Sequence, residues 1–411
     1  MITKKFSNSS QKPLVSILIP TRDRADQLYS ALISALNQTY TNLQIVVHDN
    51  SVNTDVKPYI KDLLKDTRVE YYKAKDDLSM TENWNTGFAF CTGEYFVRLD
   101  DDNVYKNNFI EESIKVIEDR NFDMMVYSCL YTDLNNSEYL LHEIDETIYQ
   151  LSSKLYLYME YNAFTDSNYV LYSKKLLETV LQDDFNLYHT NLPDRFLHYR
   201  IINLKNNLDI LIGFSTIPMG VSRYDYRPRH KSTDSLKRIN YKSVLDMDEI
   251  VQHKDCSDNF ALHRALTIRY FFKRFDTNLE DFFENEVLSS KNYLMLSYLG
   301  QISQLKSNFS FKDHLYESKL FLVILIHMLL NPFAKYELKN NIQLLPRITV
   351  IFIYRNFKFI KNLILSRDRE DDPVNLEFGD NVCSRVINNT YNFNNIKSHY
   401  NFYKELYSKF L

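Results

Sequence analysis

Cysteine and glycine are scarce in this chain of 411 residues, which has four cysteines and six glycines. The cysteines stand at positions 91, 129, 256 and 383 and form no Cys-x-x-Cys pair, so neither a zinc site nor a disulfide framework is indicated. We therefore expect reduced thiols in a cytoplasmic protein. No glycine lies between Pro20 and Asp26, which excludes the Gly-x-Gly-x-x-Gly turn of a dinucleotide-binding dehydrogenase.

Long apolar runs and a strong net charge are missing as well. No apolar stretch reaches the roughly 18 residues that a membrane-spanning helix needs, and the N-terminal segment lacks the apolar region of a signal peptide. The formal net charge of −4 predicts no nucleic-acid partner. Hydrophobic residues make up 45% of the chain, so a packed globular core is expected.

Strand and helix patterns alternate along the N-terminal half. Short apolar runs predict strands and 3.6-residue periodicity predicts the helices between them. This order indicates an α/β fold with a mostly parallel central sheet. After about residue 235 the pattern turns helical. We predict a polar leader at 1–12, an α/β domain at 13–235 and a mainly α-helical C-terminal domain at 236–411. The predicted strands are 14–19, 43–48, 69–73, 95–99 and 124–128, and the predicted helices are 25–38, 54–65, 80–91 and 108–119.

Polar clusters follow three of these strands at the point where each strand ends. They are Pro20-Thr21-Arg22-Asp23-Arg24, His48-Asp49-Asn50-Ser51 and Asp100-Asp101-Asp102. Open α/β sheets bind their ligands beyond the carboxyl ends of the strands. We therefore expect the three clusters to meet in one crevice.

The triplet Asp100-Asp101-Asp102 is the most specific of these clusters. Adjacent carboxylates repel one another unless a cation joins them. Mg²⁺ or Mn²⁺ binds carboxylate oxygens together with phosphate oxygens, so the triplet predicts a metal-bound diphosphate. An acidic helix start is the alternative, because Asp is favoured there. For Asp49, a simple Asx turn is as compatible with the sequence as ligand binding.

Two segments carry a family resemblance. PLVSILIPTRDRADQLYSALISALNQTYTNLQIVVHDNS and NWNTGFAFCTGEYFVRLDDDNVY resemble the family 2 glycosyltransferases, whose domain has the GT-A fold. The match spans residues 14–128 and continues more weakly to about residue 230. The resemblance implies an inverting glycosyltransferase of the bacterial surface-polysaccharide type. It would move a sugar from a nucleoside-diphosphate sugar, above all a UDP-sugar, to a hydroxyl of a glycan or glycolipid.

The resemblance also implies roles for single residues. Asp102 would bind Mn²⁺ or Mg²⁺, Asp49 the nucleotide base, and Asp100 or Asp101 the ribose. The other candidates for nucleotide-sugar binding are Pro20, Thr21, Arg24 and Asn83. The chain departs from the family pattern at His48, where an Asp is usual, and at Glu82-Asn83-Trp84-Asn85, where Arg-Asn-x-Gly is usual. Trp84, the single tryptophan, is predicted to lie in the core rather than under a sugar.

An inverting transfer needs a general base for the acceptor hydroxyl. The segment 191–200 is similar to the acid-then-helix motif of the family, which makes Asp194 the candidate base. A helix N-cap is the alternative role. The basic loop SRYDYRPRHK at 222–231 is a candidate lid over the diphosphate, and His230 a candidate metal ligand. A solvated basic loop is equally compatible with this composition.

The C-terminal region contains a basic and aromatic stretch at 318–367, with eight Lys or Arg and one acidic residue. Such a stretch could lie on an anionic membrane surface, which would suit a lipid-linked acceptor and a peripheral location on the inner face of the membrane. A helical domain with buried apolar faces is the alternative. Two other functions stay open for the chain: a sugar nucleotidyltransferase, and a non-catalytic GT-A-like binding or assembly module.

Overall fold

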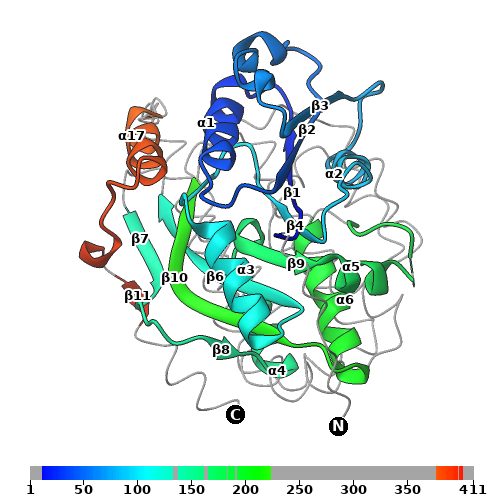
Figure 1. Cartoon of the computed structure of the whole chain (residues 1–411), viewed down its shortest axis with the longest axis vertical. Coiled ribbons are helices and arrows are strands. Elements are labelled where there is room, and N and C mark those ends of the chain that lie inside the picture. Colours follow the sequence, from blue (N-terminus) through cyan, green and yellow to red (C-terminus); the bar gives the residue numbers. More distant parts are fainter. Residues whose placement is uncertain are drawn as a thin grey trace, which may run out of the picture. The chain divides into compact units, whose positions relative to one another are not determined.

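The computed structural model describes residues 12–132, 138–161, 165–182, 184–189, 192–223, 376–396 and 398–400 (Figure 1). The chain divides into two compact units. The first comprises residues 1–189, 193–230 and 374–411, and the second comprises 190–192 and 231–373. Every described residue except Leu192 lies in the first unit.

One half of the central sheet is parallel. β1 (Val15–Thr21) lies between β2 (Leu43–Asp49) and β4 (Tyr95–Arg98), and β3 (Val69–Lys73) lies beyond β2. All residues of β1 and β2 are buried, which explains why their sequences are continuous apolar runs rather than alternating ones. Because the four strands are parallel, their carboxyl ends lie at one edge of the sheet. The predicted α/β fold is confirmed here.

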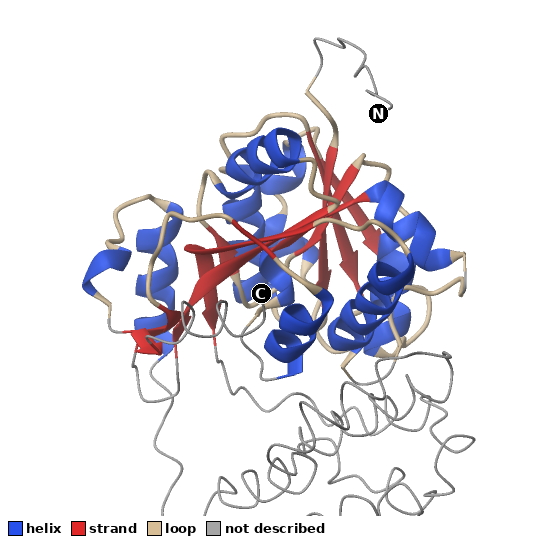
Figure 2. Cartoon of the chain, turned by 90° about the horizontal axis from the view of Figure 1, so that it is seen from below, coloured by secondary structure: helices blue, strands red, loops and turns tan. Residues whose placement is uncertain are grey.

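Helices cover both sides of this sheet (Figure 2). α1 (Ala25–Leu36) buries apolar residues at helical spacing, and α2 (Met80–Phe88) begins with a capping box in which Ser79 and Glu82 bond to each other's backbone N–H. Gly87 lets α2 approach the sheet closely, because a Cβ there would stand 2.6 Å from Leu18 Cδ1. α3 (Phe109–Arg120) follows β5 (Val104–Tyr105).

The helix predicted at 54–65 is wrong. Two short 3₁₀ helices, η1 (Lys57–Ile60) and η2 (Leu63–Lys65), take its place. Pro58 has no N–H to donate to the carbonyl of residue 54, so an α-helix cannot run through the start of this segment. In addition, the backbone N–H groups of residues 52–54 bond to the carboxylate of Asp23 instead of helping to begin a helix.

The other half of the sheet contains antiparallel pairs. β9 (Val170–Ser173) joins β4 to β6 (Met124–Thr132) and is antiparallel to both. β10 (Ile212–Arg223) runs parallel to β6 and antiparallel to β5, so the end of β10 reaches the loop after β4. The remaining elements of this half are β7 (Glu138–His142), β8 (Tyr149–Gln150), α4 (Ser153–Tyr161), η3 (Ser167–Tyr169), α5 (Lys174–Leu181) and α6 (Pro193–Asn207).

The end of the chain returns to the first unit. α17 (Leu376–Ile387) and η7 (Phe393–Asn395) lead to β11 (Ser398–Tyr400), which pairs in parallel with β7 (Figure 1). Val382, Cys383 and Val386 of α17 pack against Val104 and other apolar residues of β5, β6, β7 and β10. The predicted domain 236–411 therefore needs correction over 376–400. The apolar face of α17 was visible in the sequence, but a helix period does not tell which surface the helix covers.

Within the described ranges, no helix has both the length and the apolar character needed to cross a lipid bilayer. The basic stretch at 318–367, for which membrane contact was one of two interpretations, lies outside the described residues, as do most of the residues of the predicted helical domain.

Candidate active site

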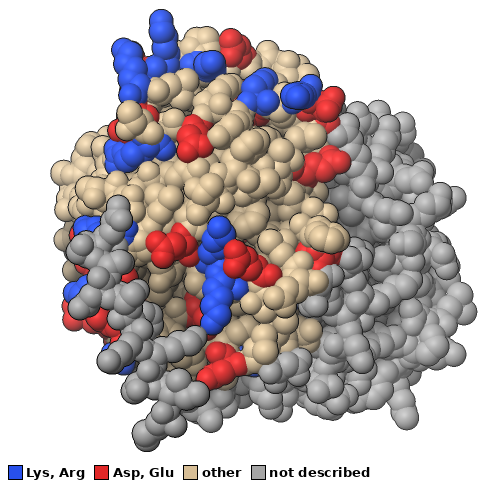
Figure 3. Space-filling view, turned by 45° about the vertical axis from the view of Figure 1, so that its right-hand side comes forward, with Lys and Arg blue, Asp and Glu red and all other residues tan. Residues whose placement is uncertain are grey.

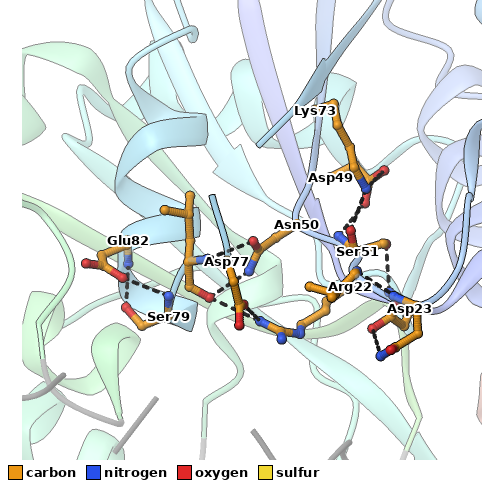
Figure 4. A network of polar contacts seen from close by, with 12 residues as sticks. Arg22, Asp23, Asp49, Asn50, Ser51, Lys73, Asp77, Ser79 and Glu82 are labelled. Atoms are coloured by element: carbon orange, nitrogen blue, oxygen red, sulfur yellow. Dashed lines mark hydrogen bonds and ion pairs between the residues drawn. The ribbon is translucent and has the colours of Figure 1, made fainter. Parts of the chain in front are cut away.

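The segment after β1 ties together the loops that follow the neighbouring strands. Thr21 and Arg24 reach the carboxylates after β4. Arg22 and Asp23 instead reach the loops after β3 and β2 (Figure 4). Arg22 Nη1 donates to Asp77 Oδ1 at 2.7 Å and to the Leu78 carbonyl at 3.1 Å. Four consecutive side chains therefore fix the relative positions of the strand-end loops, as the carboxyl edge of a parallel sheet allows.

Asp23, which joins β1 to the loop after β2, has an unusual backbone conformation. Its φ of 56° lies in the left-handed region, which Asp and Asn tolerate better than most residues. The carboxylate accepts backbone N–H groups of Val52, Asn53 and Thr54 at 3.1, 2.7 and 2.8 Å, and the Asn53 amide at 3.1 Å. Partial burial raises the pKa of the Asp23 carboxyl, but these hydrogen bonds outweigh it and hold the pKa below its usual value.

The structure brings Thr21 and Arg24 together with the acidic triplet, as the sequence predicted. Arg24 Nη1 lies 3.0 Å from Asp101 Oδ1 and 2.9 Å from Asp102 Oδ2, and Thr21 Oγ1 donates to Asp101 Oδ2 at 2.7 Å. Burial raises the pKa of Asp101, although Arg24 opposes the change. Asp102 is more open than Asp101, with 19% of its side chain exposed against 7%.

Asp100 points to a different set of partners. Its carboxylate forms an ion pair with Arg98 and accepts from Asn168 Nδ2 at 3.0 Å, while Asn168 Oδ1 of the same side chain accepts the Asp100 backbone N–H at 2.6 Å. Asn168 belongs to η3, the turn just before β9. This turn therefore holds the first carboxylate of the triplet from the far half of the sheet.

Asp194 is joined to the same turn. It lies in the first turn of α6, and its Oδ2 accepts the Ser167 hydroxyl at 3.0 Å. Ser167 Oγ in turn accepts Arg98 Nη2 at 2.6 Å. A chain of contacts thus runs from Asp100 through Arg98 and Ser167 to Asp194. Asp194, the candidate base, is therefore linked to the acidic triplet through Arg98 and Ser167.

Asp49 lies apart from this chain. Its side chain has no exposed surface; Oδ2 accepts Tyr71 OH at 2.5 Å and Lys73 Nζ at 2.9 Å, and Oδ1 accepts the Ser51 backbone N–H at 2.7 Å. The last contact is the Asx turn that the sequence left open as an alternative. A base contact by Asp49 would require its buried carboxylate to become accessible, and both of its oxygens already accept from protein groups (Figure 4).

Asn83 is also engaged inside the protein. Its Oδ1 lies 2.5 Å from His48 Nδ1, and both side chains are buried between α2 and β2. Burial lowers the pKa of His48, which favours the neutral imidazole. Placing Asn83 at the donor site stays a prediction. The pair gives a reason for one departure from the family pattern: His48 replaces an acidic residue and finds its partner in Asn83.

A buried charge cluster lies beneath Asp194. Glu160, which has no exposed surface, lies 2.6 Å from Arg195 Nη1 and 2.9 Å from His198 Nδ1 through its Oε2. Burial raises the pKa of the Glu160 carboxyl, but His198 and Arg195 outweigh burial and bring the pKa down to about 2. Arg195 also donates to the carbonyl of Thr165 at 3.2 Å. The residue next to Asp194 therefore anchors α6 to the end of α4.

The remaining predicted residues lie in three settings. Pro20 is buried within β1, opposite His48 of β2. Arg223 ends β10 and its Nε donates to the Asp102 carbonyl at 2.8 Å, so it supports the triplet loop from the protein side rather than standing in a lid. His230, the second candidate metal ligand, lies outside the described residues with the rest of its loop.

The triplet offers one carboxylate that suits a divalent cation. Among the described residues, no three His, Cys, Asp or Glu side chains are arranged to hold a metal ion. A magnesium or manganese site does not need three, because such ions take one or two carboxylates and complete their shell with phosphate and water. Asp102 fits this requirement through its partly exposed side chain, whereas Asp101 is buried against Thr21 and Arg24. On the face shown in Figure 3, basic side chains lie beside acidic ones.

Sequence reasoning missed Arg98, Ser167, Asn168 and Glu160. One signal was available: Arg98 is a charged residue inside the buried strand pattern Phe96-Val97-Arg98-Leu99, and a charge in such a place needs a partner. The roles of Ser167 and Asn168 had no local signal, because Asp166-Ser167-Asn168 reads as an ordinary turn.

The same stretch of chain that builds this site matches a known protein family. The family described as glycosyl transferase family 2 matches residues 16–181. Residues 16–181 form a family 2 glycosyltransferase domain. The match includes all four strand ends of the parallel half and the turn that contains Ser167, and it ends before Asp194.

Relatives of this glycosyltransferase domain are similar over part of their length. A glycosyltransferase of Rickettsia prowazekii, uncharacterised in function, is 34% identical over 137 residues, covering 32% of this chain and 40% of that protein. The GalNAc(5)-diNAcBac-PP-undecaprenol beta-1,3-glucosyltransferase of Campylobacter jejuni is 33% identical over 92 residues, covering 22% and 30%. The matches span between 16% and 42% of the length of five further curated glycosyltransferases. The crystal structure of TarS 1-349 from S. aureus superposes with a TM-score of 0.45 at 13% identity, over 87% of this chain and 93% of that one.

Proposed function

We propose that this protein is an inverting glycosyltransferase that moves a sugar from a UDP-sugar to a hydroxyl of a glycan or lipid-linked glycan, in surface-polysaccharide synthesis. The observation that carries the proposal is the chain of contacts from the acidic triplet to Asp194. These contacts join the candidate base Asp194 to Asp100, two residues before the candidate metal-binding Asp102, and so support a base and a donor site in one region. The lipid-linked acceptor is supported by the Campylobacter jejuni relative, a GalNAc(5)-diNAcBac-PP-undecaprenol beta-1,3-glucosyltransferase.

The proposed reaction is a single displacement at the anomeric carbon of the sugar, with Asp194 as the base. The acceptor oxygen forms a bond to the anomeric carbon from the face opposite the diphosphate, and its proton passes to the Asp194 carboxylate. The bond between that carbon and the diphosphate oxygen breaks, and the nucleoside diphosphate leaves with the electron pair. The transition state is oxocarbenium-like, as in glycoside hydrolysis. A well-placed general base of this kind contributes about 10²- to 10⁴-fold to the rate.

The donor side depends on Asp102 and Arg24. Asp102 would hold Mn²⁺ or Mg²⁺, which supplies positive charge to the diphosphate as it leaves. Arg24 holds Asp101 and Asp102 at nearly equal distances, so it keeps the two like charges together before the donor binds. The Arg24 guanidinium also lies at the carboxyl edge of the parallel strands, where it would donate hydrogen bonds to the phosphate oxygens of the donor.

Release of nucleoside diphosphate tests this proposal. The full chain would be incubated with UDP-, GDP- and dTDP-sugars and Mn²⁺, and the released nucleoside diphosphate (UDP, GDP or dTDP) would be measured. We expect Asp194→Asn to lower turnover about 10²- to 10⁴-fold while UDP still binds in isothermal titration. Asp102→Asn should weaken Mn²⁺-dependent UDP binding. Asp26→Asn, an exposed carboxylate in the first turn of α1, is the matched control and should leave both unchanged.

Two outcomes would contradict the proposal. Release of pyrophosphate from a nucleoside triphosphate and a sugar phosphate would identify a nucleotidyltransferase. Tight binding of a nucleotide-sugar by the wild-type protein, with no release of nucleoside diphosphate even when glycan acceptors are added, would identify a binding module.

A further inference from the structure

Arg98 is the most deeply buried cation at the site, and the proposed reaction gives it no role. Its side chain is 3% exposed and lies on β4, the strand that ends at the acidic triplet. A guanidinium in such a place is unfavourable unless it is paired and hydrogen-bonded. Arg98 has both: an ion pair with Asp100 and a 2.6 Å bond to Ser167 Oγ. The Trp84 ring also lies 3.6 Å from the guanidinium carbon, a cation–π contact.

The proton inventory of these groups sets the direction of the hydrogen bonds. A guanidinium has donors only, so Ser167 Oγ must accept from Arg98. A serine hydroxyl has one proton, and once the oxygen accepts from Arg98 that proton is available for another partner. That partner is Asp194 Oδ2, at 3.0 Å. The hydrogen bond from Arg98 therefore fixes the orientation of the Ser167 hydroxyl, which donates its proton to Asp194 Oδ2.

We propose that Arg98 and Ser167 are positioning residues that aim the Asp194 carboxylate at the acceptor hydroxyl. This inference rests on the proposed function. Ser167 holds Oδ2, which orients Oδ1 as the oxygen that receives the acceptor proton. Because the same guanidinium binds Asp100, the orientation of the base is also linked to the carboxylate that begins the donor side. A misplaced base loses rate without losing donor affinity, since the base does not bind the nucleotide.

Ser167→Ala tests the inference most directly. UDP release from a UDP-sugar with Mn²⁺ should fall about 10- to 100-fold, the range expected for one hydrogen bond to a charged group. The dissociation constant of UDP with Mn²⁺ should stay within about twofold, because Ser167 is placed on the base. Ser167→Thr keeps the hydroxyl and should recover most of the lost turnover. Ser113→Ala removes another buried serine hydroxyl, one that donates to the Phe109 carbonyl far from Asp194 in the sequence, and should change neither quantity.

A second measurement does not depend on activity. Unfolding by urea of the full chain would be followed by the fluorescence of Trp84, the single tryptophan, which reports on the first unit. The Ser167–Asp194 bond predicts that Ser167→Ala destabilises the Asp194→Ala protein by less than half as much as it destabilises the wild type.

The outcomes separate this inference from the proposed function. Turnover of Ser167→Ala within twofold of wild type, or an equal loss of turnover and UDP affinity, overturns the positioning role. Additive effects in the unfolding measurement overturn the Ser167–Asp194 contact itself. If wild-type protein releases UDP from no UDP-sugar, the proposed function fails, while the unfolding measurement still decides whether the contact exists.

Discussion

Two parts of this protein each contain an ion pair between an arginine and a carboxylate, one exposed to solvent and one buried. At the strand ends, Arg22 and Asp77 form an ion pair with 29% and 44% of their side chains exposed. Beneath Asp194, Glu160 is fully buried and Arg195 is 9% exposed. The free energy of an ion pair depends on burial more than on distance, since the 2.7 and 2.6 Å separations are almost equal. An exposed pair such as Arg22–Asp77 therefore contributes little to stability, whereas the Glu160 cluster holds α6 in one place.

Glu160→Gln should have the largest effect on stability. The substitution leaves Arg195 as a buried cation without its anionic partner, which typically lowers the free energy of unfolding by about 3–5 kcal/mol. Urea unfolding followed by Trp84 fluorescence measures the change. Asp77→Asn, which removes the acid of the exposed pair, should lower it by less than about 0.5 kcal/mol. Equal effects of the two substitutions would refute the contrast between the two regions.

The same cluster should control stability in acid. The pKa of Glu160 falls from 4.5 to about 2 on folding, so its contribution is fully present above pH 4.5 and is lost as the pH falls toward 2. Such a shift corresponds to about 3 kcal/mol. The free energy of unfolding, measured at several pH values from 6 to 2, should therefore fall more steeply with decreasing pH for wild type than for Glu160→Gln. Parallel curves would show that Glu160 is not the responsible acid.

Asp23 should show an intermediate effect that separates its side chain from its backbone. Asp23→Ala loses the carboxylate that accepts three backbone N–H groups and places a less tolerant residue at φ 56°, which should lower the free energy of unfolding by about 2 kcal/mol. Asp23→Asn tolerates this φ and keeps one acceptor oxygen, so we expect about 1 kcal/mol. Thermal unfolding distinguishes them, and a larger loss for Asn than for Ala would contradict this account.

Arg22→Met should have the smallest effect. The aliphatic part of the side chain is retained, and the exposed ion pair with Asp77 contributes less than about 0.5 kcal/mol at physiological salt. The difference from wild type should also shrink as sodium chloride is raised to about 1 M, because exposed charges are screened. An effect that is large and independent of salt would place this pair with the buried cluster instead.

The predictive power of the sequence differed between the two regions for a physical reason. The strand-end clusters are local: each directly follows an apolar run, and parallel strands bring their carboxyl ends to one edge. Thr21, Arg24 and Asp101 were therefore expected to lie together, and they do. The contacts of Ser167 with Arg98 and Asp194, and of Glu160 with Arg195 and His198, join residues that are 27 to 69 positions apart, and no local pattern records such pairs.

Asp49 and Asn83 show the limit of motif reasoning inside the matched region. Both stand where the family pattern places donor-binding residues, yet each has protein partners that the pattern did not name. Lys73 and Tyr71 compete for Asp49, and His48 binds Asn83. A motif records the type of residue at a position, whereas the direction of its side chain depends on neighbouring strands and helices.

By itself, the sequence determined the order of strands and helices in the N-terminal half, the strand ends where polar residues collect and the family of residues 16–181. Those features follow from local periodicity and from short motifs. Only the tertiary structure decided that Arg98 and Ser167 link the acidic triplet to Asp194, that Glu160 anchors α6, and that α17 and β11 return to the first unit. Such contacts depend on which surfaces remain uncovered once the sheet has formed, and that information is distributed over the whole fold.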